Sequence, residues 1–287
     1  MSEHVASALD GITPDVIVHA THLVRKGQVI SLNLPLDGPT PTTRPRLRRT
    51  LRLHNQLRPL GDGRFVVLND DIVELATQGS SQWDTFAHCG VIAPGKAGVF
   101  LGGVGLEETL PGGMPPRLGL GAFGAGVVTR GVLIDTVALL RSEVGHLEET
   151  DRVSRADVEE CLRRQGSELH RGDVVFLYTG FGRRYSMSDD AMPKVAGGID
   201  GSTMPLWSEA GVAALVSDNI AVEASPANFD VHIACLVEFG IALGELWALE
   251  ELATACREDG VYEFLLVSVP LNLPYAFGSP ANAVAIR

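Results

Sequence analysis

QGSSQWDTFAH, residues 78–88, places two amides, a carboxylate and an imidazole within one short stretch of the chain. Asp84 and His88 are four positions apart, so they share a face on a helix and also on an extended strand. Because that spacing is common in proteins, it needs further residues to define a site. An extended segment would line one pocket with all of its even-numbered polar and aromatic residues, namely Gln78, Gln82, Asp84, Phe86 and His88.

A second pair of candidate groups, His232 and Glu245, lies in the C-terminal part of the chain. We expect His232 near the start of a helix over 231–239, and Glu245 beyond the turn at Gly240 on a returning strand. Such a helix and strand can bring both side chains to the same end of a sheet. Taken alone, the pair is more typical of a core histidine and a surface acid.

The composition restricts the classes of partner and compartment. The chain has 287 residues, of which 45% are hydrophobic and 20% charged, as in a soluble globular protein. A net charge of −12 argues against nucleic acid and anionic membranes as partners. The cysteines include no Cys-x-x-Cys pair, so we do not expect a thiolate zinc site. We find no signal sequence and no apolar run that would span a bilayer, and therefore expect a cytoplasmic protein.

Strands and helices alternate along the chain, which predicts an α/β or a mixed α+β fold, and of these we expect α/β. Without a break in composition, we expect a single domain over residues 1–287. Ser154 and Asp157 form the pattern of a helix start. We further expect strands at 28–36, 173–179, 220–224 and 262–271, and helices at 131–141, 231–239 and 249–257.

Two segments interrupt this alternation. Residues 39–55 are rich in Pro, Thr and Arg and predict an exposed loop or arm. Its arginines suit a solvated arm or a subunit contact, with anion binding as the alternative. Residues 95–126 are rich in Gly and Pro and follow soon after the 78–88 stretch, so they form either a lid over a site or a plain surface crossover. The arginines of the arm are Arg44, Arg46, Arg48, Arg49 and Arg52.

The 78–88 stretch resembles a signature of the metal-dependent cyclase/hydrolase family that includes bacterial kynurenine formamidase and isatin hydrolase. That signature reads His-x-Gly-Thr-His-x-Asp-x-Pro-x-His, and here glutamines replace its first two histidines, as in a Gln-Trp-Asp variant branch. The stretches at 130–135, 172–180 and 278–282 also resemble the family. The resemblance implies a swivelling β/β/α fold with a mixed sheet flanked by helices, usually assembled as a homodimer or homotetramer.

The resemblance also implies a role for each matching residue. Asp84 matches a metal-ligating aspartate, and His88 matches the last histidine, which is suited to proton transfer. His232 and Glu245 match a later pair of ligands. Gln78 and Gln82 stand where ligand histidines are expected and would bind a metal only weakly. We therefore expect one divalent metal ion rather than two, manganese or zinc, or no metal at all.

The function that follows is hydrolysis of a small cyclic or linear amide, lactam or lactone. A metal would activate water or a carbonyl, His88 would act first as base and then as acid, and Trp83 and Phe86 would form an apolar wall or pack in the core. In a first alternative, Asp84 and His88 perform metal-free acid–base catalysis as in a dehydratase, lyase or cyclase, and one carboxyl pKa is raised. A second alternative is a ligand-binding protein that kept the fold without catalysis.

Overall fold

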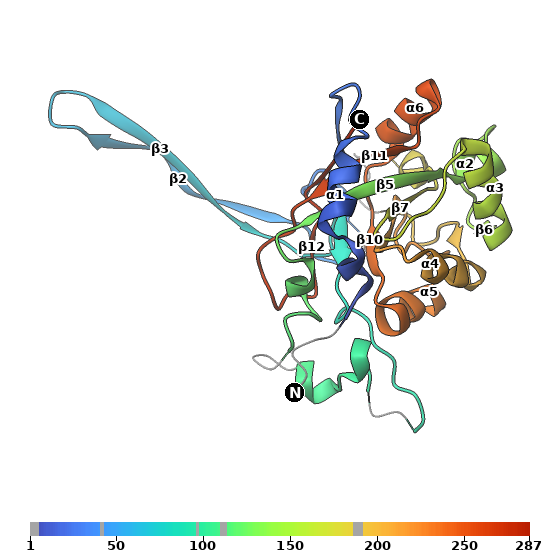
Figure 1. Cartoon of the computed structure of the whole chain (residues 1–287). Helices are drawn as coiled ribbons and strands as arrows, with labels where there is room; N and C mark the ends of the chain where they lie inside the picture. Colours follow the sequence, from blue (N-terminus) through green and yellow to red (C-terminus); the bar gives the residue numbers. More distant parts are fainter. Residues whose placement is uncertain (1–5, 41–42, 96–97, 110–113, 186–191) are drawn as a thin grey trace.

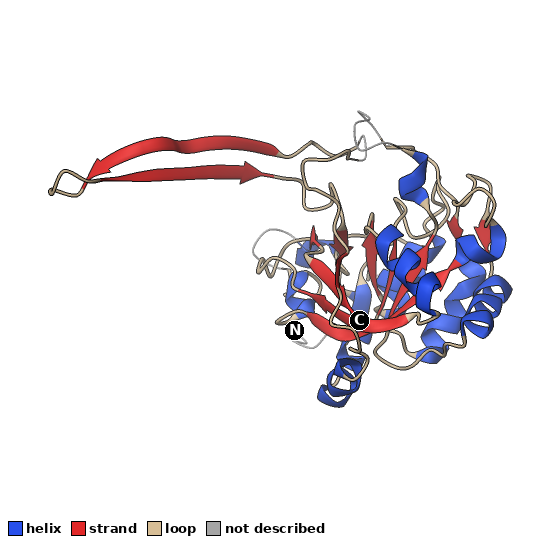
Figure 2. Cartoon of the chain, turned by 90° about the horizontal axis from the view of Figure 1, so that it is seen from above, coloured by secondary structure: helices blue, strands red, loops and turns tan. Residues whose placement is uncertain are grey.

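A mixed β-sheet forms the centre of the computed structural model, which describes residues 6–40, 43–95, 98–109, 114–185 and 192–287. Within these residues, nine strands pair in the order β1-β13-β11-β5-β7-β9-β10-β4-β12. The sheet curls and helices pack around it (Figures 1 and 2). The strands are β1 (Val29–Ser31), β4 (Gln82–Asp84), β5 (Val127–Asp135), β7 (Val174–Tyr178), β9 (Ala214–Ser217), β10 (Ala242–Glu245), β11 (Glu263–Ser268), β12 (Gly278–Pro280) and β13 (Ala283–Ile286).

The middle of the sheet is parallel and its two sides are antiparallel. Strands β5, β7, β9 and β10 run parallel to one another. On either side of these four strands, β11 pairs with β5 and β4 pairs with β10 in the antiparallel sense. Every residue of β7, β9 and β10 is buried, as is typical of parallel strands covered on both faces, although β9 and β10 end in the polar residues Ser217 and Glu245. The strand predicted at 173–179 is thus confirmed as β7. The expected strand at 262–271 forms as β11, and the one at 28–36 shortens to β1.

The helices are short and cover the sheet by their apolar faces. The predicted start of α3 at Ser154 is confirmed: its hydroxyl accepts from the Asp157 amide at 3.3 Å, and the Asp157 carboxylate accepts from the Ser154 amide at 2.9 Å. None of the described helices has the length and apolar character to cross a membrane. The helices are α1 (Pro14–Thr21), α2 (Thr136–Leu140), α3 (Arg155–Gln165), α4 (Met204–Ala210), α5 (Asp230–Ile233), which continues as a π-helical segment (Ala234–Phe239), and α6 (Glu250–Asp259).

Two expected elements are different in the structure. The helix predicted over 131–141 is wrong for its first half, where β5 extends to Asp135 and α2 begins only at Thr136. The apolar run in β5 suits a strand paired on both sides as well as a buried helix, and the pairing with β7 and β11 decides the matter. The strand predicted at 220–224 is wrong too, because Val222 has a φ of 57° and the chain turns there.

The exposed arm is a long β-hairpin and lies later in the chain than the sequence indicated. Strands β2 (Arg48–Pro59) and β3 (Phe65–Glu74) pair only with each other and project from the body (Figures 1 and 2). Near the body, ion pairs join the two strands: Arg49 to Asp71 at 2.5 Å and Arg52 to Asp70 at 2.8 Å. Two short strands, β6 (Arg152–Val153) and β8 (Gly198–Ile199), form a further small sheet.

The Gly/Pro-rich segment at 95–126 consists of loops and single turns of 3₁₀-helix in its described residues. The turns are Leu101–Gly103, Leu106–Thr109 and Leu120–Phe123. Residues 96–97 and 110–113 of the expected lid lie outside the described residues. The Ala87 amide donates to the Leu118 carbonyl at 2.9 Å, so this segment packs directly against residues 78–88. Its closure over a ligand stays a prediction.

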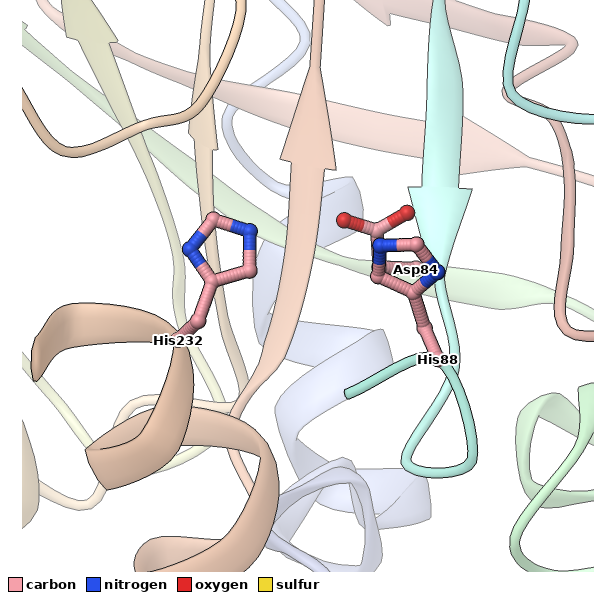
Figure 3. Close-up of side chains that lie close together, drawn as sticks. All are labelled: Asp84, His88 and His232. Atoms are coloured by element: carbon pink, nitrogen blue, oxygen red, sulfur yellow. The ribbon is translucent and has the colours of Figure 1, made fainter. Parts of the chain in front are cut away.

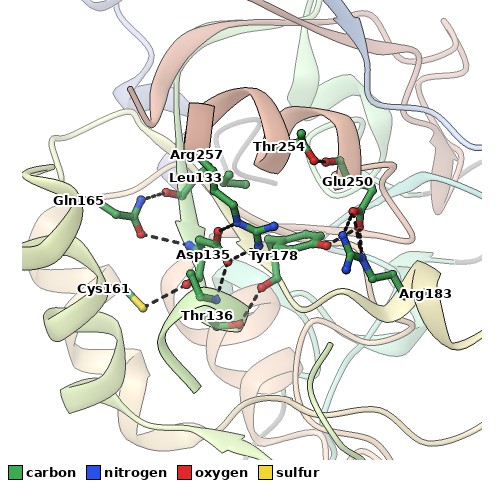
Figure 4. A network of polar contacts seen from close by, with 11 residues as sticks. Leu133, Asp135, Thr136, Cys161, Gln165, Tyr178, Arg183, Glu250, Thr254 and Arg257 are labelled. Atoms are coloured by element: carbon green, nitrogen blue, oxygen red, sulfur yellow. Dashed lines mark hydrogen bonds and ion pairs between the residues drawn. The ribbon is translucent and has the colours of Figure 1, made fainter. Parts of the chain in front are cut away.

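A polar network joins the ends of β5 and β7 to α6 (Figure 4). Arg257 donates to both carboxylate oxygens of Asp135, at 2.6 and 3.0 Å, and its guanidinium lies 5.2 Å from the centre of the Tyr178 ring. The Tyr178 hydroxyl and the Arg183 guanidinium both donate to Glu250. These contacts anchor α6 on the sheet. They also provide hydrogen-bond partners for polar groups that lie away from the candidate site.

Candidate functional site

The pairing of β4 decides which side chains face the candidate site. This strand lies between β10 and β12 and runs antiparallel to both. Its register places Gln82 opposite Glu245, and Asp84 opposite Leu243. Because side chains alternate along a strand and opposite partners share a face, Gln82, Asp84 and Glu245 lie on the same face of the sheet.

Three predicted site residues meet beside that face. One possible ligand atom from each of Asp84, His88 and His232 lies within 4.8 Å of the other two. Asp84 stands at the end of β4, His88 lies in the turn that follows, and His232 points toward them from α5 (Figure 3). Asp84 and His232 are buried, and His88 is half-buried. The structure therefore brings the aspartate and the distant histidine to one place, as the sequence analysis required.

Gln78 connects Asp84 to His88. Its amide nitrogen lies 2.6 Å from Asp84 Oδ1 and 2.6 Å from His88 Nδ1, while its carbonyl oxygen accepts from Arg44 at 3.4 Å. An amide nitrogen only donates, so His88 Nδ1 accepts and the neutral ring carries its proton on Nε2. Gln78 thus holds the aspartate and the imidazole in place, although the family signature has a metal-ligating histidine at this position.

Gln82 and Glu245 form the neighbouring contact. The Gln82 amide donates to Glu245 Oε2 at 2.8 Å, and Glu245 Oε1 lies 3.3 Å from His232 Nε2. Burial, together with the nearby charge of Asp84, raises the pKa of Glu245 to about 7. Glu245 thus lies beside the group formed by Asp84, His88 and His232, and contacts it through His232.

Glu223 is a site residue that the sequence analysis missed. Its Oε1 lies 2.5 Å from His232 Nδ1, and its Oε2 accepts from the Val231 amide at 3.3 Å. Burial alone favours the neutral imidazole, but the hydrogen bonds to Glu223 and Glu245 outweigh it and raise the pKa of His232 to about 11. No pattern in the sequence indicated this contact, because the expected strand at 220–224 implied a regular alternation of side chains that the turn at Val222 removes.

The donor atoms of the site fit a divalent cation. Asp84 Oδ2 and Gln82 Oε1 are buried oxygens without a hydrogen-bond partner among the described residues, which is a costly state unless an ion or water contacts them. Asp84, Glu223 and Glu245 are three buried carboxylates, and the ion pairs of both glutamates are with His232. A cation would offset this excess of negative charge. Oxygen and imidazole donors suit manganese and zinc.

The aromatic residues of the stretch belong to the core. Trp83 points to the opposite face of β4 from Asp84, donates to Ser268 Oγ at 2.8 Å and packs against the Trp247 ring at 4.9 Å between centroids. Phe86 is completely buried as well. The expectation that Trp83 and Phe86 form a substrate wall is therefore corrected: neither ring has free surface for a ligand, and both stabilise the segment that carries Asp84 and His88.

Comparison with known proteins defines the family. The model of a family described as "Putative cyclase" matches residues 30–224, which include both the 78–88 stretch and Glu223. The chain belongs to the cyclase family. A crystal structure described as a novel cyclase has 32% sequence identity and a TM-score of 0.86, and the match covers 99% of this chain and 96% of that chain. No curated protein matches significantly.

More distant structures share the fold of this cyclase-family chain. Isatin hydrolase A from Ralstonia solanacearum has 16% identity and a TM-score of 0.58, over 90% of this chain and 91% of that chain. A predicted metal-dependent hydrolase from Bacillus stearothermophilus has 13% identity and a TM-score of 0.54, over 90% of this chain and 97% of that chain. The predicted family and its fold, a mixed sheet flanked by helices, are confirmed.

Proposed function

We propose that this cyclase-family chain is a hydrolase that opens a C–N or C–O bond in a small cyclic or linear amide, lactam or lactone. The observation that carries the proposal is that one possible ligand atom from each of Asp84, His88 and His232 lies within 4.8 Å of the others, beside Asp84 Oδ2, an oxygen that has no hydrogen-bond partner in the described part of the chain. The fold neighbours give further support, since they include an isatin hydrolase and a predicted metal-dependent hydrolase.

Asp84 and His232 are the residues we assign to hold one divalent ion, with Glu245 and Gln82 as additional oxygen donors. An ion bound there lowers the pKa of water or polarises a carbonyl group. His232 is held for this task by Glu223, whose carboxylate fixes Nδ1 and directs Nε2 toward Glu245. Gln78 stands where the family signature has a ligand histidine, and it forms hydrogen bonds to Asp84 and His88 instead of binding a metal. The loss of this ligand favours one ion over two.

His88 is the residue we assign to proton transfer. While Nδ1 accepts from Gln78, a neutral ring carries its proton on Nε2, and loss of that proton would leave an imidazolate. His88 therefore takes up a proton at Nδ1 first, once Gln78 releases that atom, and then gives a proton to the leaving nitrogen or oxygen. This is the order expected from the sequence, in which His88 acts first as a base and then as an acid.

Metal content and hydrolysis together test the proposal. We expect protein purified without chelator to hold about one manganese or zinc ion per chain, and Asp84→Ala and His232→Ala to lose both the ion and the activity. The matched control is His19→Ala, because His19 is exposed on α1. Elemental analysis gives the metal content, and ring opening of small lactams, lactones and cyclic amides, including isatin, gives the activity.

The raised pKa of Glu245 favours a second candidate, metal-free acid–base catalysis. A carboxyl group with a pKa of about 7 can exchange protons near neutral pH. Metal-free protein that turns over substrate, with activity lost in His88→Ala and Glu245→Gln but unaffected by chelator, would establish this candidate and overturn the hydrolase with a metal. Tight ligand binding without turnover on the whole panel would instead indicate a binding protein.

A further inference from the structure

Arg44 lies beside the candidate site. Its Nη2 donates to Gln78 Oε1 at 3.4 Å, and the Gln78 amide nitrogen lies 2.6 Å from both Asp84 Oδ1 and His88 Nδ1. Two hydrogen bonds and one amide group therefore connect the guanidinium to Asp84, and the two charged groups are less than roughly 9 Å apart. A small ring compound is long enough to contact Arg44 at one end and to reach Asp84 and His88 with the other.

The Arg44 guanidinium has no carboxylate partner in the described part of the chain, although the residue is half-buried. Its contact with Gln78 is long and uses one of five N–H donors. A partly buried charge without a counter-charge costs free energy, which a bound anion would offset. Every other described arginine that is buried or half-buried forms an ion pair with Asp or Glu, namely Arg117, Arg130, Arg141, Arg155, Arg184 and Arg287.

The surroundings of Arg44 differ from those of the arginines that follow it. Three exposed arginines on the hairpin form ion pairs with acidic residues of β3, namely Arg48, Arg49 and Arg52. Arg44 precedes the hairpin, where Pro45 borders the same small hollow as Ala76 and Gly79. This packing places the Arg44 backbone next to the segment that carries Gln78. The anion-binding alternative for the arginines of residues 39–55 therefore applies best to Arg44.

A carboxylate is the ligand group that fits this arrangement. The planar guanidinium presents paired N–H donors whose spacing matches the two oxygens of a carboxylate. Asp84, Glu223 and Glu245 are buried acids, so the interior of the site repels an anionic group. Arg44 provides a positive charge at the edge of the site, where a carboxylate can bind while the uncharged part of the same molecule extends inward.

We infer that Arg44 is a specificity-determining residue that binds a carboxylate group of the substrate. The inference rests on the proposed function and narrows its substrate class: the molecule carries a carboxylate in addition to the amide or ester bond that breaks. With this carboxylate on Arg44, the rest of the molecule extends past Gln78 toward Asp84 and His88. Holding the molecule at both ends orients the bond that breaks next to His88.

Binding of matched neutral and anionic compounds tests this inference without requiring turnover. Suitable pairs differ by one carboxylate: phthalimide and trimellitimide, isatin and isatin-5-carboxylate, and pyrrolidone and pyroglutamate. We expect calorimetric titration of the wild type, as purified, to show tighter binding of the anionic member in at least one pair. In Arg44→Gln, that preference should fall about tenfold or more, because a charge-assisted hydrogen bond is lost, while the Kd of the neutral member stays within about twofold.

Two further variants show whether the charge of Arg44 itself is responsible. Arg44→Lys keeps the charge without the paired donors and should retain part of the preference. Arg48→Gln is the matched control, because Arg48 is exposed and lies 3.6 Å from Glu74, and it should bind as the wild type does.

Three outcomes would overturn the inference. The first is a wild type without preference for the anionic member of any pair, and the second is a preference that Arg44→Gln leaves intact. The third is an equal loss for both members of a pair, which would mean that Arg44 acts only by holding Gln78. Hydrolysis of the same compounds judges the proposed function separately: binding with the expected preference but without turnover would contradict the hydrolase and leave the carboxylate site in place.

Discussion

At the scale of single residues, the candidate site depends on side chains that hold other side chains. Gln78 bonds both Asp84 and His88, and Glu223 bonds His232. Neither Gln78 nor Glu223 is one of the three residues whose possible ligand atoms meet at the site. Both restrict the orientation of a group that would contact a metal or substrate, which is the role that outer carboxylates and amides have around metal-ligating histidines.

Glu223→Gln tests this positioning role. The amide can still accept from His232 Nδ1 but loses the negative charge, so we expect metal affinity to fall about 10- to 100-fold while the fold is kept. Calorimetric titration of the metal-free protein with Mn²⁺ and with Zn²⁺ gives the affinity. The control is Glu238→Gln, an exposed glutamate on the π-helical segment that continues α5. Equal affinities in the two variants would show that Glu223 does not position His232.

At the scale of elements, local sequence signals were enough to predict some helices, whereas the strands depend on their pairing within the sheet. The Ser154 cap and the glycine at the end of α3 were readable because they act within a few residues. The β5 segment was not, since its apolar run suits both a strand and a buried helix until β7 and β11 pair with it.

Ser154→Ala provides the test at this scale. Loss of the hydroxyl leaves the Asp157 amide without its partner, so we expect the free energy of unfolding to decrease by about 1 kcal/mol. Urea unfolding followed by circular dichroism measures it. Ser208→Ala is the control, because Ser208 is exposed on α4 and caps no helix start. A loss of similar size in both variants would rule out a specific contribution of the cap.

At the scale of the whole molecule, a buried acid makes stability depend on pH. Asp218 accepts from the Thr179 amide and hydroxyl at 2.8 and 2.7 Å and from the Phe181 amide at 3.0 Å. Burial raises the pKa of Asp218 to about 6, although these hydrogen bonds oppose the change. Between its ordinary pKa near 4 and this value, the folded protein binds a proton that the unfolded chain releases.

This stabilising contribution is therefore complete below about pH 4 and is lost as the pH rises through about 6. We expect the difference in free energy of unfolding between wild type and Asp218→Asn to fall by up to about 3 kcal/mol from pH 4 to pH 7. Urea titrations at several pH values measure it, with the exposed Asp37→Asn as the control. Parallel curves for wild type and Asp218→Asn would contradict the assignment.

The amino-acid sequence by itself determined the family, the mixed sheet with its helices, and the small set of residues around Asp84. These follow from spacing, apolar periodicity and motif, which act over short distances along the chain. Only the tertiary structure decided that Glu223 bonds His232, that Trp83 faces the core, and that Gln78 joins Asp84 to His88. The reason is that strand register and the turn at Val222 set the direction of these side chains, and both depend on neighbours far away in sequence.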